Sequence, residues 1–375
     1  MGYTTPQQVS RSWLLSMTEW ATQPLLGSTA ALWRGNEYRA GGLRQGAAAA
    51  HILVFDRATK RVVEEAVSPG LMLAMRAMYQ TSEGALLLRE GTCRKLKQMS
   101  EKYGARADSP ESAADIPKFL AAFRGQIDMK VREGPQANLV CCSPAPAPLR
   151  SLPLLLPPAL SLSHPALLPH LSRRLTVFNS VDDATRCWIK GKKFSLAGML
   201  GDAGAAAAAS PDGGADGGAD AVDPRAVAPA PEGGSMAIFR LAPQDYHRFH
   251  LPVSGRVESI TDIPGELLTV NPIAVNSRFA DVFTRNKRSV LCLRAPGYGL
   301  VAYVAVGATV VGSIRWTVEV GQEVAKGAEA GYFAFGGSTC VVLFQEGAAV
   351  WDADLAKNSL KSLETRVLMG ERLGV

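Results

Sequence analysis

The stretch FGGSTCVVLF, residues 335 to 344, places two adjacent glycines directly before an apolar run. Adjacent glycines reach backbone conformations that are closed to other residues, which is typical of a tight turn. The run that follows, 338 to 344, is rich in valine and predicts a strand. Similar apolar runs at 290 to 295, 299 to 314 and 317 to 320 also predict strands. We therefore expect a β-rich core from Met236 onward.

The N-terminal part of the chain has helical spacing of its apolar residues instead. Residues 69 to 88, PGLMLAMRAMYQTSEGALLL, carry a proline near the start and Met and Leu across one face. Further helices are expected over 96 to 103 and 116 to 123. The expected fold class is α+β, with a mainly helical region, 1 to 130, packed on the β-rich core.

Composition limits the kinds of partner and site. The 375 residues are 47% hydrophobic, which is enough to bury the core of one large or two modest domains. A net charge of +6 favours an anionic partner, and without a nucleic-acid motif we expect a lipid surface and no nucleic acid. Six cysteines without a CxxC pair, and only five histidines, argue against a metal site and a disulfide framework.

Contact with a membrane is expected to be peripheral. No run of about 18 uninterrupted apolar residues is present, and the longest candidate, 151 to 171, is broken by five prolines. Trp13, Met17 and Trp20 have helical spacing and could enter a membrane interface, although packing in a core is the more ordinary interpretation. The first ten residues show no basic start or apolar core of a secretory signal.

Two stretches interrupt the pattern of helices and strands. Residues 131 to 173 contain a Pro/Leu-rich run without helix or strand periodicity, an anomalous insertion. Residues 201 to 235 are mainly Ala, Gly, Pro and Asp and contain too few bulky apolar groups to offset the entropy of ordering. We expect the second stretch to be a disordered surface loop.

The sequence DYHRFHLP, 245 to 252, contains His247 and His250, which alone would be interpreted as a structural pair. The glycine turn at Gly337-Ser338 would likewise be interpreted as a loop. Five segments in order change that interpretation: 241 to 257, 263 to 275, 283 to 292, 306 to 314 and 335 to 345. With these motifs the chain resembles the phosphatidylserine decarboxylases. Segments 51 to 65, 109 to 120 and 180 to 201 resemble the eukaryotic endomembrane branch.

The resemblance implies self-cleavage at Gly337-Ser338, which converts Ser338 into an N-terminal pyruvoyl group, the protein-derived cofactor. His250 matches the histidine that drives maturation, because a serine needs a nearby base to become a nucleophile. His247 matches the residue to which the family assigns a role in decarboxylation. The pyruvoyl group would form a Schiff base with phosphatidylserine, accept electrons as carbon dioxide leaves, and release phosphatidylethanolamine. Neither pyridoxal phosphate nor a metal is required.

The resemblance also implies how the chain is divided. Residues 174 to 200 would begin the catalytic core and 236 to 337 would complete the large β subunit, with a core similar to a barrel-sandwich fold. Residues 338 to 375 would form the small α subunit, paired with the β subunit as a heterodimer, and two such pairs could form a homodimer. The expected place is the surface of an internal membrane, the endoplasmic reticulum or another endomembrane, with mitochondria as the alternative.

One position departs from the family pattern. The family has an aspartate directly after the small residues matched by Ser143-Pro144-Ala145, and this chain has Pro146 there, so no triad aspartate is matched. Asp182 and Asp183 are possible substitutes. The loss favours an alternative, an uncleaved pseudoenzyme that binds aminophospholipid without turnover. A lipoyl- or biotinyl-type carrier is a third possibility, but the sequence offers no convincing carrier lysine in an exposed tight turn.

Overall fold

A computed structural model describes 14 segments of the chain. The segments are residues 39–40, 43–44, 51–66, 69–88, 90–115, 117, 173–191, 194–201, 233–242, 245, 247–309, 313–333, 337–368 and 370–375. The predicted tryptophan-containing N-terminal helix, the helix at 116 to 123 apart from Pro117, the Pro/Leu-rich insertion apart from Arg173 and most of the Ala/Gly-rich loop lie outside them.

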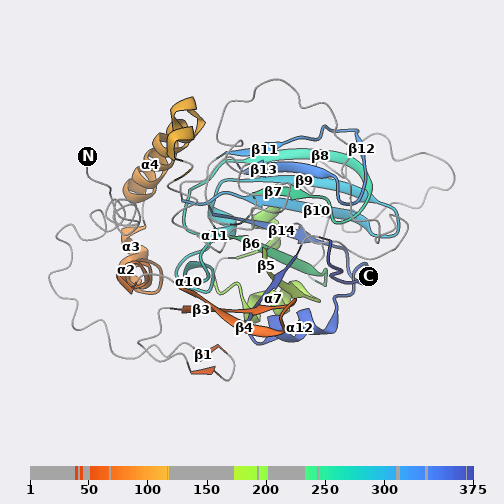
Figure 1. The fold of residues 1–375 in the computed structure, drawn as a ribbon, viewed down its shortest axis with the longest axis horizontal. Helices are drawn as coiled ribbons and strands as arrows, with labels where there is room; N and C mark the ends of the chain where they lie inside the picture. Colours follow the sequence, from red (N-terminus) through yellow and green to blue (C-terminus); the bar gives the residue numbers. More distant parts are fainter. Residues whose placement is uncertain are drawn as a thin grey trace.

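A ten-stranded sheet forms the centre of the protein (Figure 1). In spatial order its strands are β12 (Glu323–Val324), β8 (Gly255–Ile263), β9 (Arg288–Ala295), β10 (Gly299–Val306), β14 (Ser338–Leu343), β6 (Met236–Leu241), β5 (Arg173–Phe178), β15 (Glu364–Val367), β3 (His51–Asp56) and β4 (Arg61–Ala66). All neighbours pair antiparallel except β15 and β3, which are parallel. The strand β14, which begins at Ser338, therefore lies inside the sheet with a partner on each side.

A second sheet of three strands covers one face of the first. Its order is β11 (Ile314–Trp316), β13 (Glu329–Phe333) and β7 (Arg248–His250). Phe249 of β7 stacks on Tyr303 of β10 with ring centroids 5.5 Å apart, and Trp316 meets Phe249 edge-on at 5.2 Å. Because Phe249, Tyr303, Cys340 and Val342 belong to one buried cluster, the two sheets share a core, which we call the inter-sheet core.

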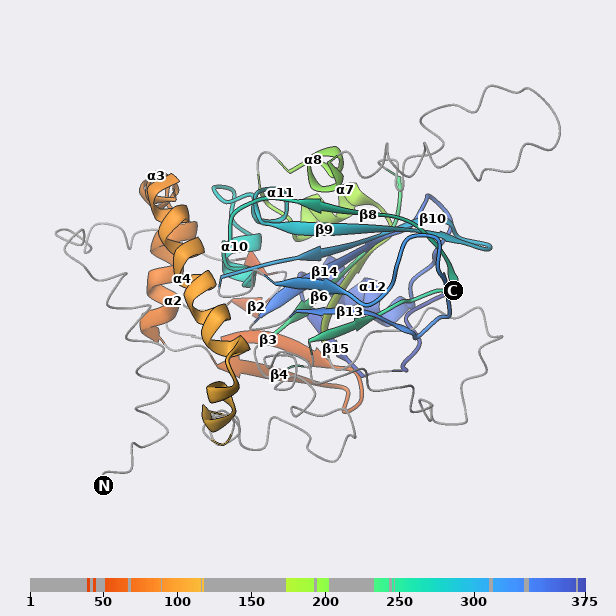
Figure 2. The same cartoon turned by 90° about the horizontal axis from the view of Figure 1, so that it is seen from above.

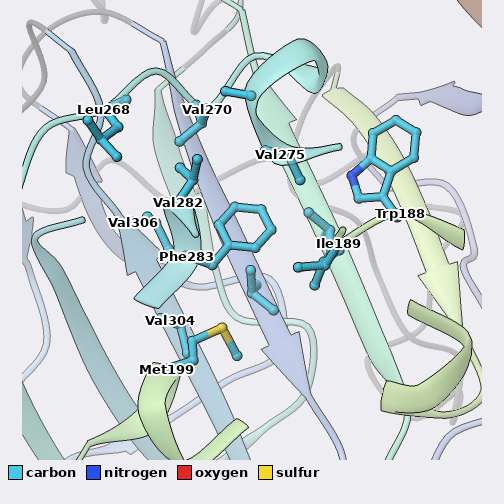
Figure 3. Packing of buried hydrophobic residues seen from close by; sticks show 14 of the residues in the cluster. Trp188, Ile189, Met199, Leu268, Val270, Val275, Val282, Phe283, Val304 and Val306 are labelled. Atoms are coloured by element: carbon cyan, nitrogen blue, oxygen red, sulfur yellow. The ribbon is translucent and has the colours of Figure 1, made fainter. Parts of the chain in front are cut away.

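The opposite face of the ten-stranded sheet is covered by short helices. These are α7 (Val181–Cys187), α8 (Leu196–Leu200), α10 (Pro272–Val275) and α11 (Val282–Arg285). Alternate residues of β14, Val341 and Leu343, point into this second cluster, which we call the helix-side core. Figure 3 shows Phe283 and Met199 beside Val304 and Val306 of β10, with Trp188 and Ile189 nearby.

The described N-terminal part contains helices, as predicted, together with a hairpin that belongs to the core sheet. The helices are α2 (Pro69–Tyr79), α3 (Ser82–Leu87), α4 (Glu90–Asp108) and the 3₁₀ helix η2 (Pro110–Asp115). They lie together beside one end of the sheets (Figures 1 and 2), while β3 and β4 extend the large sheet at its edge. Two short antiparallel strands of two residues each, β1 (Arg39–Ala40) and β2 (Leu43–Arg44), precede them in the chain.

Two predicted elements differ from those observed. The helix predicted over 69 to 88 is divided, because Thr81 caps α3 by accepting a hydrogen bond from the backbone of Gly84 at 2.9 Å. The strand predicted over 317 to 320 is absent, and these residues lead into a turn at Gly321, whose φ of 86° favours glycine. The run from 299 ends as a strand at Val306, and Ile314 begins β11.

The mixed α+β class is confirmed, with a large sheet and comparatively short helices along the described chain. The strands predicted at 290 to 295 and 338 to 344 are confirmed as β9 and β14. The last helix, α12 (Ala353–Leu360), packs against β5 and β15. The similarity to a barrel-sandwich core and the division into two subunits stay predictions.

Candidate active site

Ser338 is the first residue of β14 and is fully buried. Its backbone pairs with Leu241 of β6. Its hydroxyl has no hydrogen-bond partner among the residues that the structure describes. An unsatisfied buried hydroxyl costs about 1–3 kcal/mol and usually has a functional or chemical explanation. Gly337, directly before it, is half-buried, so the predicted cleavage site lies at the entrance to a buried strand.

His250 ends β7, and 3% of its surface is exposed. Its Nδ1 lies 2.9 Å from the carbonyl oxygen of Gly327. Since a carbonyl only accepts, Nδ1 carries the proton and the lone pair of the neutral ring is on Nε2. Burial lowers the pKa of His250 to about 4, with further lowering by the charges of Arg173 and Arg248, against an opposing effect of the Gly327 hydrogen bond. His250 is therefore a neutral base near pH 7.

His247 is also buried, and two contacts with the backbone hold it in place. Its Nε2 donates to the carbonyl oxygen of Ala242 at 3.1 Å, and Ala242 directly follows Leu241, the sheet partner of Ser338. Its own carbonyl accepts from the amide of Phe333 at 3.0 Å, four residues before Gly337. These two contacts connect His247 with the residue that follows β6, the strand paired with Ser338, and with the last residue of β13.

Arg173 connects the strands that carry these residues. It is fully buried at the start of β5; its Nη1 lies 3.8 Å from Cys340 Sγ, and its Nη2 donates to the carbonyl of Arg248. Cys340 is two residues after Ser338 and therefore on the same face of β14, and Arg248 lies between the two histidines. One guanidinium thus joins β5, β14 and β7. Sequence interpretation missed Arg173, although it is in phase with the buried Leu175.

Asp245 is the second residue that sequence interpretation left without a role. Its Oδ2 accepts from the amide of Ala242 at 2.7 Å and from Nη1 of Arg174. Burial raises the pKa of Asp245, although the charge of Arg174 opposes this effect. Its position two residues before His247, in the quoted motif, was the available signal. Asp245 fixes the turn against which the ring of His247 is held.

The structure does not place the two suggested substitutes for the triad aspartate near the histidines. Asp182 and Asp183 lie in the first turn of α7, which packs on the helix side of the large sheet. Asp182 is exposed, and Asp183 pairs with Arg186 at 2.6 Å. Pro146 lies outside the described residues.

A family model described as phosphatidylserine decarboxylase matches residues 172–375. The matched span includes Ser338, both histidines and the strands that hold them. The chain belongs to the phosphatidylserine decarboxylase family. The resemblance predicted from five ordered motifs is thereby confirmed.

Several curated members of the phosphatidylserine decarboxylase family are similar to this chain. It is 44% identical over 375 residues to "Phosphatidylserine decarboxylase proenzyme 2" of Oryza sativa subsp. japonica, covering 100% of this chain and 54% of the relative. It is 34% identical over 337 residues to "Phosphatidylserine decarboxylase proenzyme 3" of Schizosaccharomyces pombe, covering 89% of this chain and 32% of the relative. A "Phosphatidylserine decarboxylase proenzyme" of Chlamydia trachomatis serovar D is 44% identical over 198 residues, which is 53% of this chain and 58% of the relative. This family member spans about a third to somewhat over half of their lengths.

Two features are absent from the described residues of this family member, a metal-binding cluster and a membrane-spanning helix. They contain no group of three or more His, Cys, Asp or Glu side chains placed to hold a metal ion. Their helices include none that is both long enough and apolar enough to cross a bilayer.

Proposed function

We propose that this chain is a self-cleaving proenzyme that converts phosphatidylserine to phosphatidylethanolamine and carbon dioxide. The observation that carries the proposal is Ser338, a buried hydroxyl without a described partner at a Gly-Ser bond, in a fold that also buries His247 and His250. The names of the similar proteins, which are decarboxylase proenzymes, support the same reaction. The proposed cofactor is the pyruvoyl group made from Ser338.

The first step of maturation uses the neutral ring of His250. Its Nε2 takes the proton of Ser338 Oγ, and Oγ attacks the carbonyl carbon of Gly337. The bond from that carbon to the nitrogen of Ser338 breaks, leaving an ester and a free amine. General-base help of this kind supplies about 10²- to 10⁴-fold in rate. Gly337 suits the position because the absence of Cβ leaves room for the attack geometry.

The second step removes the α-proton of residue 338 and expels the carboxylate of Gly337. The dehydroalanine that remains takes up water and releases ammonia, which leaves a pyruvoyl group at the start of β14. Ser338 fits this conversion because its side chain is already desolvated in the inter-sheet core and makes no described hydrogen bond that must first break. Once formed, the group supplies an electron sink for decarboxylation.

Sheet pairing would hold the two products of cleavage together. The new α subunit, 338 to 375, keeps β14 between β10 and β6, with hydrogen-bonded partners on both sides. It also keeps β15 between β5 and β3. Because both strands lie inside the sheet, the α and β subunits should remain a heterodimer after the peptide bond breaks.

His247 is assigned to turnover. Its Nε2–H donates to the carbonyl of Ala242, so the lone pair of the neutral ring is on Nδ1. Nδ1 would first take up a proton and then deliver it to the carbon that has lost carbon dioxide. The net charge of +6 supports peripheral binding to an anionic internal membrane, the endoplasmic reticulum or another endomembrane. A homodimer of the mature pair is compatible with this arrangement.

Intact mass under denaturing conditions tests the proposal. We expect two fragments divided at Gly337-Ser338, the smaller with the mass of an N-terminal pyruvoyl group, and release of carbon dioxide from vesicles that contain phosphatidylserine. The pseudoenzyme alternative is favoured by Pro146, which stands where the family has its aspartate. A single uncleaved chain that binds the same vesicles without releasing carbon dioxide would establish that alternative.

A further inference from the structure

An N-terminal strand outside the family-model span contributes a charge to the site. Glu65 lies on β4, whereas the family model begins at residue 172. Its Oε2 is 2.6 Å from Nε of Arg174 on β5 and 2.9 Å from Nη2 of Arg240 on β6. The side chain of Glu65 is 19% exposed, so these ion pairs are largely shielded from water. The hairpin β3–β4 therefore places a carboxylate among the core strands.

The contacts continue from Glu65 to the ring of His247. Arg174 donates through Nη1 to Oδ2 of Asp245, and the same oxygen accepts from the amide of Ala242 at 2.7 Å. The carbonyl of Ala242 then accepts from His247 Nε2 at 3.1 Å. Asp245 thus accepts from the backbone amide of Ala242, and His247 donates to the backbone carbonyl of the same residue. Arg174 binds Asp245 through its guanidinium.

The charges along this path explain why Glu65 matters to it. Burial tends to raise the pKa of Glu65, but the charges of Arg240 and then Arg174 outweigh it and the pKa is lowered, so Glu65 is ionised. The guanidinium of Arg174 is shared between Glu65 and Asp245. If Glu65 were neutral, Arg174 would be free to move toward Asp245, and the turn that holds Ala242 would shift with it.

We propose that Glu65 is a positioning residue for His247, acting through Arg174, Asp245 and Ala242. The proposal rests on the proposed function, in which His247 serves turnover and His250 serves maturation. Its consequence is a separation of the two activities. Loss of the Glu65 charge should leave self-cleavage intact, since the hydrogen bond of His250 goes to Gly327, which is not part of the path from Glu65, and should impair decarboxylation.

The test compares Glu65→Gln with Glu364→Gln as a matched control. Glu364, on β15, is 2% exposed and pairs with Arg240 at 2.6 Å, as Glu65 does at 2.9 Å. The contacts described for Glu364 do not include Arg174. Both variants therefore remove one carboxylate from Arg240, but only Glu65→Gln removes one from the path to His247. Glu65→Asp keeps the charge on a shorter side chain.

Three measurements on the full chain separate positioning from general stability. Intact mass gives the cleaved fraction, vesicles of phosphatidylserine give kcat and KM, and ¹⁵N–¹H spectra of the histidine rings report the tautomer of His247. Five histidines in the chain make the ring spectra assignable. For Glu65→Gln we expect normal cleavage, unchanged KM and a kcat lower by about tenfold, part of the roughly 10²- to 10⁴-fold that a proton-transferring group supplies.

For Glu65→Asp we expect a kcat between those of the wild type and Glu65→Gln, and for Glu364→Gln a kcat close to wild type. The Nε2–H signal of His247 should shift in Glu65→Gln and not in Glu364→Gln. Equal kcat values and equal ring spectra for the two Gln variants would overturn the proposal. If the wild-type chain does not cleave, the proposed function fails, and the ring spectra of the uncleaved variants still decide whether Glu65 positions His247. If Glu65→Gln does not fold, Glu65→Asp takes its place in the comparison with the wild type and Glu364→Gln.

Discussion

The two faces of the ten-stranded sheet differ in what they bury. The helix-side core is formed by apolar side chains such as Phe283, Met199 and Trp188, whose packing Figure 3 shows. The inter-sheet core has an apolar centre around Phe249. The residues Arg173, His247, His250 and Ser338 are all at least 96% buried as well. The helix-side face also buries hydrogen-bonded polar groups such as Arg288, which donates to the carbonyls of Met199 and Gly198. Ser338, in contrast, points to the inter-sheet face, and the histidines lie in and beside β7 of the second sheet.

The difference shows how one sheet can serve stability and chemistry together. Apolar burial stabilises without directional requirements, at about 25 cal/mol per Å². Buried polar groups destabilise unless they are hydrogen-bonded, so each must be held by a specific partner. The histidines meet this requirement through the carbonyls of Gly327 and Ala242, and Ser338 does not meet it among the described residues. Other buried groups, such as the hydroxyl of Thr339, also have no partner among the described residues, but Ser338 is the one that the proposed maturation consumes.

The largest effect is expected from two neighbours on β14 that face opposite ways. Ser338→Ala removes the attacking oxygen and should leave a single uncleaved chain, seen by intact mass. Thr339→Val removes the adjacent hydroxyl, on the helix-side face, without changing the shape of the side chain, and should cleave as the wild type does. Cleavage of Ser338→Ala, or its loss in Thr339→Val, would contradict the assignment of chemistry to one face.

Two phenylalanines compare the faces in stability. Phe283→Ala and Phe249→Ala each remove a ring that is at least 98% buried, and each should lower the free energy of unfolding by about 3–5 kcal/mol. Urea denaturation in the Ser338→Ala background measures this effect. At a temperature where both variants are folded, only Phe249→Ala should slow cleavage, because Phe249 lies on β7 between the histidines. Equal cleavage rates would show that the two cores are interchangeable.

The pH dependence of stability should include a contribution from His250. Its pKa is about 4 in the folded chain and 6.5 when exposed, so between these values the unfolded chain binds more protons. Stability should therefore fall by about 3 kcal/mol as pH decreases from 6.5 to 4. Urea denaturation of Ser338→Ala across this range should show the slope, and Ser338→Ala with His250→Gln should show a smaller one. If stability depends on pH with the same slope in both variants, the proton taken up on unfolding binds a group other than His250.

The smallest effect is a displacement of the pH profile of maturation. Arg173 contributes to lowering the pKa of His250, so Arg173→Met should raise that pKa and move the acid limit of self-cleavage to higher pH. Cleavage rates measured between pH 4 and 7 give the limit. The exposed Arg315 offers the control, since Arg315→Met should leave the limit where it is. If the acid limit of self-cleavage is unchanged in Arg173→Met, the charge of Arg173 does not affect the pKa of His250, and Arg173 has a structural role only.

Part of the fold and of the site could be predicted from local sequence. The apolar runs of β9 and β14 produced correct strand predictions because most of their side chains are buried on both faces. The motifs gave both histidines and the Gly337-Ser338 bond. The run at 317 to 320 has strand-like residues, but Gly321 and the pairing of β11 with β13 make it a turn. The helix at 69 to 88 is divided by the cap of Thr81.

The sequence by itself determined the family, the mixed class and the candidate reactive residues, because these depend on short motifs and local periodicity. Only the tertiary structure placed Glu65 beside Arg240, 175 residues away, and Arg174 beside Asp245, 71 residues away. It also decided which face of β14 carries Ser338 and which carbonyl fixes each histidine. These contacts depend on strand order and register across the whole sheet, and a local pattern of residues contains no information about either.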